Sequence, residues 1–135
     1  MSTSGEPGIL VVDDERAIRF AFTAFFSSVG MAVDCAGSYD DALTCLERRS
    51  YGVVLADVRL EGSGDTTGLD VVAQARRRLP GCQIIVLTAY ATTEMESRAR
   101  ASGANEFLHK PQSLHELAAR VRDGLNRYPN HATRR

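Results

Sequence analysis

The stretch Ile9-Leu-Val-Val-Asp-Asp-Glu15 joins a short apolar run to three consecutive acids. Uninterrupted runs of Val, Ile and Leu are typical of strands buried on both faces of a sheet. Similar runs occur at 53–56 and 84–87, and more mixed segments at 31–36 and 104–109 are candidates for edge strands of the same sheet. The sequence therefore predicts five strands.

Helical periodicity fills the segments between these strands. In the first of them, apolar residues recur at spacings of three and four from Ile18 to Val29, and Gly30 is placed to end the helix. Further helices are predicted from Ser38 to about Arg49, over 69–79, over 92–102, and after Ser113. Strands that alternate with helices predict an α/β fold: a doubly wound parallel sheet with right-handed crossovers and helices on both faces.

Composition limits the classes of protein that this chain can be. Its 135 residues suit one domain, with 44% hydrophobic and 24% charged residues, as in ordinary globular proteins. The net charge is −1, from 16 basic and 17 acidic residues, so we expect no direct nucleic-acid contact. No apolar run reaches the roughly 20 residues that cross a bilayer, so we expect no membrane segment.

The chain ends and the cysteines complete this description. Residues 1–7 are expected to be a disordered leader without signal-peptide character, 8–126 the folded domain, and 127–135 a polar tail or the start of a linker. Three cysteines without close spacing fit a reducing compartment, so we expect a cytoplasmic protein whose cysteines are core or half-buried residues. The run Arg76-Arg77-Arg78 is expected to be a solvated helix face.

Polar residues end four of the predicted strands. Asp13 and Asp14 follow the first run, Asp57 the third, Thr88 the fourth and Lys110 the fifth. Ligands of open α/β sheets bind at the carboxyl ends of the strands. Carboxylates gathered there repel one another, and Lys110 together with a hard cation such as Mg²⁺ would neutralise them. The sequence predicts a site for a phosphoryl group, to which Thr88 offers a hydroxyl.

Each of these residues also has an ordinary structural interpretation. Asp14 could cap the first helix, and Asp57 could be a polar residue at a strand end. Thr88 could be a β-branched strand residue, and Lys110 a solvated residue before Pro111, which leads into the last helix. Their joint placement at four strand ends favours a binding site.

Four segments carry a resemblance to a known family. Leu10-Val-Val-Asp-Asp-Glu15, Val53-Val-Leu-Ala-Asp57, Leu87-Thr-Ala89 and Phe107-Leu-His-Lys-Pro111 resemble the signature segments of the receiver domain of two-component response regulators. The resemblance covers about residues 8–126. It implies a flavodoxin-like (βα)5 fold with strand order 2-1-3-4-5.

The resemblance also implies roles for individual residues. Asp57 would accept a phosphoryl group from the phosphohistidine of a sensor histidine kinase or a histidine phosphotransfer protein. Mg²⁺ would be bound directly by Asp14, mainly through water by Asp13, by Asp57, and by the backbone carbonyl of Arg59. Lys110 would pair with Asp57 and then with the phosphoryl oxygens. The protein would phosphorylate and dephosphorylate itself without being a turnover enzyme.

Signalling would follow from movements at two switch residues. Thr88 would move toward the phosphoryl group, and Phe107 would turn inward behind it. The face formed by the fourth helix, fifth strand and fifth helix would then change, because Met95 and Ala99 alone anchor the fourth helix. The chain, a monomer or weak dimer, would act on a downstream effector protein or on a C-terminal output domain, such as a DNA-binding one.

Three features depart from the usual family pattern. Glu61 stands where many receivers have Pro, and the 58–67 loop between Asp57 and Gly68 is longer than usual. Arg59 and Tyr90 occupy positions that flank the phosphoryl site. The first two differences are expected to alter the loop beside the metal, and the bulk of Arg59 and Tyr90 to shield the site from water.

Other functions on the same fold fit less well. A flavodoxin-like cofactor binder needs a phosphate-binding loop of Gly, Ser or Thr where the acids 13–15 stand. An aspartate-nucleophile phosphatase needs its nucleophile at the end of the first strand, where Asp13 fits poorly. A pseudo-receiver that is never phosphorylated usually lacks one of the acidic or Lys positions, all of which are present here.

Overall fold

The structure is a computed structural model that describes residues 8–58, 67–89 and 91–133, apart from the side chains of 67 and 128–133. Within these ranges five strands alternate with five helices, as predicted. The elements are β1 (Gly8–Val12), α1 (Arg16–Ser28), β2 (Val33–Ala36), α2 (Tyr39–Arg48), β3 (Tyr51–Ala56), α3 (Thr67–Arg78), β4 (Gln83–Thr88), α4 (Thr93–Ser102), β5 (Glu106–His109) and α5 (Leu114–Thr133).

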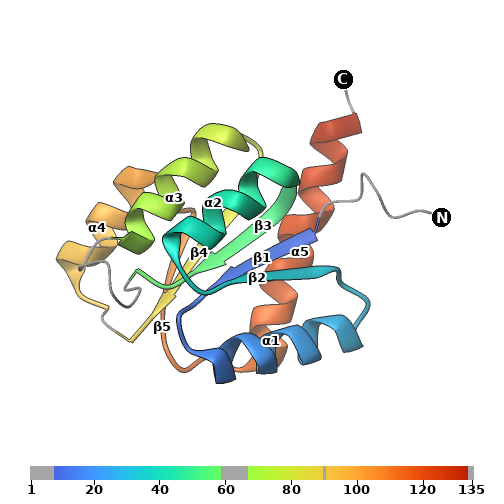
Figure 1. The fold of residues 1–135 in the computed structure, drawn as a ribbon, viewed down its shortest axis with the longest axis horizontal. Coiled ribbons are helices and arrows are strands. Elements are labelled where there is room, and N and C mark those ends of the chain that lie inside the picture. Colours follow the sequence, from blue (N-terminus) through green and yellow to red (C-terminus); the bar gives the residue numbers. More distant parts are fainter. Residues whose placement is uncertain (1–7, 59–66, 90, 134–135) are drawn as a thin grey trace.

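All five strands are parallel and lie in the order β2-β1-β3-β4-β5. Figure 1 shows the strand arrows pointing the same way, with α1 and α5 on one face of the sheet and α2 and α3 on the other. The register pairs Val12 of β1 with Ala56 of β3, so Asp13 and Asp57 leave the sheet side by side. The chain reverses its direction of winding between β1 and β3, which is where open α/β sheets bind ligands.

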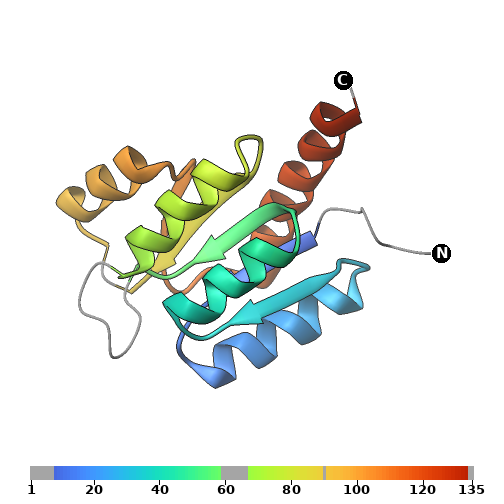
Figure 2. The same ribbon diagram turned by 45° about the horizontal axis from the view of Figure 1, so that its top comes forward.

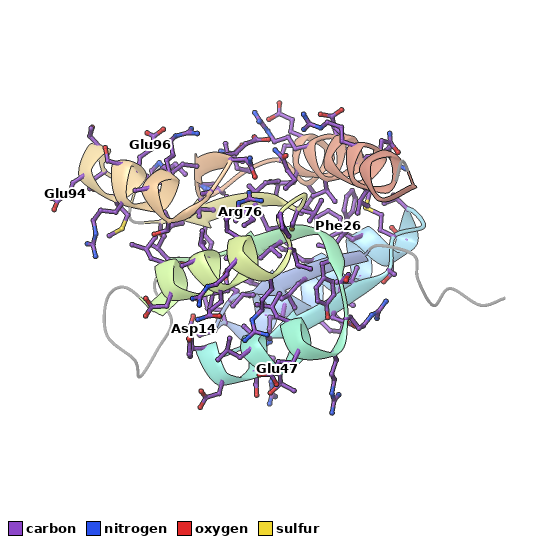
Figure 3. The ribbon with its side chains drawn as sticks, turned by 90° about the horizontal axis from the view of Figure 1, so that it is seen from above. Asp14, Phe26, Glu47, Arg76, Glu94 and Glu96 are labelled. Carbon is purple, nitrogen blue, oxygen red and sulfur yellow. The ribbon has the colours of Figure 1, made fainter. Side chains whose placement is uncertain are left out.

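The apolar core forms two layers, one on each face of the sheet. Leu10, Val54 and Ile84 pack toward α2, α3 and α4, whereas Ile9 and Val53 pack toward α1 and α5. This alternation is the period of two expected when both faces of a strand are covered. Figure 3 shows the fully buried Phe26 of α1 pointing inward in the second layer.

Helix boundaries largely agree with the sequence. The Ser38 hydroxyl accepts from the Asp41 amide at the start of α2, and Ser113 accepts from the Glu116 amide at the start of α5. Gly30 follows α1 with a φ of +90°, which favours glycine. The N-cap of α1 is Glu15 and makes no side-chain cap bond, so Asp14 does not occupy the capping position.

The fifth helix is longer than the sequence predicts. It continues to Thr133, through positions expected to belong to a polar tail (Figure 2). The apolar stripe ends near Leu125, but helical hydrogen bonding can continue on a solvated segment, and the ion pair of Arg127 with Asp123 supports it one turn apart. The domain boundaries at 8 and 126 stay a prediction.

Arg76 corrects a prediction. Its guanidinium donates to the backbone oxygens of Gly103 (2.9 and 3.1 Å), Pro80 (2.8 Å) and Cys82 (2.9 Å), and to Asn105 Oδ1 (2.7 Å). We call this group the Arg76 junction. It joins the end of α3 to the turns before β4 and β5, and Figure 3 shows Arg76 on the side of α3 that faces α4. Of the three arginines, only Arg77 and Arg78 are exposed.

Within the described ranges, no helix combines the length and apolar character that crossing a membrane requires.

Candidate functional site

Three charged side chains meet at the carboxyl ends of β1, β3 and β5. Lys110 Nζ donates to Asp13 Oδ2 at 2.8 Å and to Asp57 Oδ2 at 3.0 Å. The backbone places the two acids, because the Asp57 amide donates to the Val12 carbonyl at 3.0 Å and so continues the β1–β3 pairing. The structure therefore brings together the three residues that the sequence placed at these strand ends.

The pocket is largely withdrawn from water. The side chains of Asp13, Asp57 and Lys110 are 5%, 9% and 18% exposed. Burial on its own would lower the pKa of Lys110, but the hydrogen bonds and charges of Asp13 and Asp57 outweigh it and raise this pKa above its ordinary value. The amine is thus held as an ammonium between two carboxylates, which leaves one negative charge in excess.

Asp13 is fixed by both its backbone and its side chain. Its amide donates to the Ala36 carbonyl of β2 at 3.1 Å, and its Oδ1 accepts from the Glu15 amide at 2.9 Å. Its carbonyl accepts from Arg19 Nη1 at 2.7 Å. Asp14, the next residue, is only partly buried and lies at the edge toward which the strands point, as labelled in Figure 3.

The predicted switch residues lie on β4 and β5. Thr88 ends β4 and is fully buried, and its carbonyl accepts from the Lys110 amide at 2.9 Å. Phe107 pairs with Val86 and is half-buried against the core layer of α2, α3 and α4. His109 is exposed, as expected for a residue that alternates with Lys110. The switching roles themselves stay predictions.

Gly68 is a site residue for which the sequence offered no functional signal. A Cβ at this position would lie 2.0 Å from the Asp57 carbonyl oxygen and 2.4 Å from Val58 Cα. The first turn of α3 therefore crosses directly over the end of β3, which only glycine permits. The Gly68 amide also donates to the Val58 carbonyl at 3.0 Å.

Several predicted features lie outside the described residues. These are the Arg59 carbonyl, Glu61, Tyr90 and most of the 58–67 loop. Sequence reasoning also missed the cis peptide between Lys110 and Pro111 and the contact of Arg19 with Asp13. An arginine on an amphipathic helix reads as solvated, so the sequence held no signal for that contact.

The donors in the pocket suit a hard cation. Carboxylate oxygens such as those of Asp13 and Asp57 are the ligands that Mg²⁺ prefers, and the negative excess favours a cation. In the part of the chain that the structure describes, no three His, Cys, Asp or Glu side chains are already grouped as a metal site. Lys110 holds an oxygen of both buried acids. The chemistry of the donor set fits the ion.

A family model described as "Response regulator receiver domain" matches residues 9–122 of the chain. The chain belongs to this family. The recognised resemblance and the strand order that it implied are therefore confirmed. Receiver domains are phosphoacceptors of two-component signalling, and they generally bind Mg²⁺.

Individual relatives agree with this membership. The alginate biosynthesis transcriptional regulatory protein AlgB of Pseudomonas aeruginosa is 35% identical over 117 residues, 86% of this chain but 25% of that protein. The chain thus spans about a quarter of this curated relative.

Two solved structures share the fold. A CheY-like receiver domain protein from Methanospirillum hungatei superposes with a TM-score of 0.84 at 25% identity, covering 93% of this chain and 98% of that one. A response regulator from Burkholderia pseudomallei, solved with a phosphorylated aspartic acid, a calcium ion and citrate, has a TM-score of 0.79 at 24% identity and covers 94% of this chain and 73% of that one. At that identity the second likeness shows the fold alone.

Proposed function

We propose that this receiver domain accepts a phosphoryl group on Asp57 from a phosphohistidine, in a reaction that depends on Mg²⁺. The observation that carries the proposal is the contact of Lys110 Nζ with both Asp57 and Asp13 in a buried pocket with excess negative charge. The donor would be a sensor histidine kinase or a histidine phosphotransfer protein in the cytoplasm.

The residues of the pocket suit an in-line displacement. A carboxylate oxygen of Asp57 forms the new O–P bond while the N–P bond of the phosphohistidine breaks and the imidazole leaves. The Lys110 ammonium neutralises charge on the phosphoryl oxygens, and the Thr88 hydroxyl donates to one of them. Such reactions need mainly positioning and neutralisation, and little covalent chemistry from the protein.

The ion would be held by Asp13, Asp14, Asp57 and the carbonyl of Arg59. When bound, Mg²⁺ would supply positive charge to the transferring phosphoryl group. The same pocket would let water hydrolyse the acyl phosphate, which resets the domain. We therefore regard the protein as a phosphoacceptor that cycles once per signal and not as a turnover enzyme.

The signal would leave through the face formed by α4, β5 and α5. Thr88 and Lys110 are joined through their backbones, so groups pulled by the phosphoryl group belong to the strands that flank α4. Ala99 is the one buried residue of α4, with Met95 partly buried beside it, so the helix is weakly held. A downstream effector or an output domain would read this face.

Phosphoryl uptake tests the proposal. The parent protein, given acetyl phosphate or phosphoramidate with Mg²⁺, should gain one phosphoryl group in its intact mass. Asp57→Asn should remove this gain, whereas Asp123→Asn, a change at a carboxylate that is 69% exposed on α5, should keep it. Equal uptake in the parent and in Asp57→Asn would refute the assignment, as would no uptake in the parent, which would favour a pseudo-receiver.

Lys110 provides a second way to measure phosphorylation of the protein. It is the only lysine of the chain, so lysine labelled with ¹⁵N gives one side-chain NMR signal. Phosphorylation should move that signal, because a dianionic phosphoryl group replaces a carboxylate oxygen beside Nζ. An unchanged signal in a protein that carries the phosphoryl group would remove Lys110 from the mechanism.

A further inference from the structure

Arg19 makes a contact that neither the family resemblance nor the proposed chemistry assigns. From the second turn of α1 its side chain reaches back to the end of β1, where Nη1 donates to the Asp13 carbonyl at 2.7 Å. Arg19 is only partly exposed. It therefore lies at the turn that carries Asp13 and Asp14 into the pocket.

Gly37 makes room for this side chain. It directly follows β2, the neighbour of β1, and a Cβ there would lie 2.7 Å from Arg19 Nη1 and 3.1 Å from Cζ. Any larger residue at this position would have to displace the guanidinium. Gly37 therefore leaves free the space that the Arg19 side chain occupies.

With Arg19 in place, every polar group of Asp13 is engaged. Its amide is bonded to Ala36, Oδ1 to the Glu15 amide and Oδ2 to Lys110, and the carbonyl to Arg19. Without Arg19 the carbonyl of a residue that is 4% exposed would lose this charged donor. The turn could then rotate to hydrate that oxygen, and the carboxylate would rotate with it.

We propose that Arg19 is a positioning residue for phosphoryl acceptance: lodged against Gly37, it holds the Asp13–Asp14 turn in the geometry that binds the divalent cation. This rests on the proposed function. Groups that hold metal ligands in place typically change metal affinity 10- to 100-fold when they are removed. We expect Arg19→Ala to weaken Mg²⁺ binding about tenfold.

The experiment is a double-mutant cycle measured by Mg²⁺ titration of the Lys110 ¹⁵N signal. Gly37→Ala keeps the arginine and its charge but pushes the guanidinium away, so it should weaken Mg²⁺ about as much as Arg19→Ala does. In the double variant Arg19→Ala/Gly37→Ala the second change should add less than twofold, because nothing is left to displace. Arg19→Lys, which keeps a donor on the same helix, should recover part of the affinity.

Amide exchange in metal-free protein separates a positioning role of Arg19 from a general loss of stability. In metal-free protein, amide exchange at Glu15, which reports the bond to Asp13 Oδ1, should speed up at least fivefold in Arg19→Ala and in Gly37→Ala. It should not change in Arg77→Ala, which removes an exposed arginine of α3. Amides in the middle of β4 should keep their protection in all variants, which shows that the fold is intact.

These measurements distinguish a positioning role of Arg19 from its alternatives. Less than a twofold change of Mg²⁺ affinity in Arg19→Ala, or fully additive effects in the double variant, would overturn the positioning role. So would faster exchange throughout β4, which would mean that the arginine merely supports the fold. Failure of the proposed function has a different signature, since the parent itself would then show neither Mg²⁺ binding nor phosphoryl uptake.

Discussion

The pocket and the Arg76 junction each gather several oxygens around one cation, but the oxygens of the pocket are charged and those of the junction are neutral. In the pocket, Lys110 faces two carboxylates, so the group keeps a net negative charge. In the junction, Arg76 faces three backbone carbonyls and one amide oxygen, none of them charged. The pocket lies at the carboxyl ends of the strands, and the junction lies at the turns that lead into β4 and β5.

The difference shows what makes one polar cluster reactive and the other structural. Arginine presents a planar fork of donors, and the junction uses it to satisfy fixed acceptors at once, which ties segments together. Lysine is a compact charge on a flexible stem, and it can exchange a carboxylate partner for a phosphoryl oxygen. The acceptors of the junction are neutral and provide no negative charge to bind a second cation, whereas an excess of carboxylate attracts cations.

The largest effect is expected from breaking the junction. Arg76→Ala should lower the free energy of unfolding by about 3 kcal/mol, because several carbonyls lose a charged donor. Arg77→Ala, on the exposed side of the same helix, should stay within about 0.5 kcal/mol of the parent. Urea denaturation followed by circular dichroism measures both. Equal losses of unfolding free energy in the two variants would show that the junction stabilises the fold no more than an exposed arginine does.

A smaller loss should follow from removing the cation of the pocket. Lys110→Met should cost about 2 kcal/mol at pH 7 in metal-free protein, since two poorly exposed carboxylates then face each other. Urea unfolding of the parent and the variant at pH 7 without metal measures this loss, and a variant as stable as the parent would contradict the account of the pocket charge.

Cys82, whose backbone carbonyl belongs to the junction, also carries a pH-dependent group, its thiol. Burial raises its pKa from 9.0 to about 12, although Arg76 lowers it in part. The folded state therefore keeps a proton that the unfolded state loses, and stability falls as pH rises from about 9 toward 12. Cys82→Ala should cost about 1 kcal/mol at pH 7, from the lost packing of a buried side chain.

This deficit should change with pH in a defined way. Groups that titrate elsewhere affect both proteins equally, so the difference between them isolates Cys82. The stability of the parent relative to Cys82→Ala should fall by about 1.4 kcal/mol for each pH unit above 9, so the initial deficit of the variant should reverse sign before pH 10.5. Urea unfolding at pH 7.5, 9.5 and 10.5 provides the values, and parallel curves for the two proteins would disprove the assignment.

The smallest effect sharpens the comparison by giving the junction a carboxylate. Asn105 Oδ1 accepts from Arg76 Nη2 and from the Ile84 amide, both at 2.7 Å. Asn105→Asp keeps both acceptor bonds and adds a charge opposite a guanidinium, at an exposed position. Stability at pH 7 should therefore change by no more than about 0.5 kcal/mol. A loss above about 1.5 kcal/mol would mean that the junction does not tolerate charge.

The sequence by itself determined the fold class and the chemistry of the pocket. The β-branched runs could be buried only between two layers of helices, and parallel strands necessarily bring the residues after them, Asp13, Asp57, Thr88 and Lys110, to one edge. Helix starts at Ser38 and Ser113 were equally local, because a cap depends on residues three positions apart. These are properties of period and position along the chain.

The tertiary structure alone decided which arginines are structural and where backbones touch. Arg19 and Arg76 look like solvated helix residues, because their partners (Asp13, Gly37, Gly103 and Asn105) lie on other elements. The reason for a glycine at position 68 is likewise visible only in the structure, where α3 crosses the end of β3. Most of these contacts involve backbone atoms, which every residue carries, so no residue pattern along the chain predicts them.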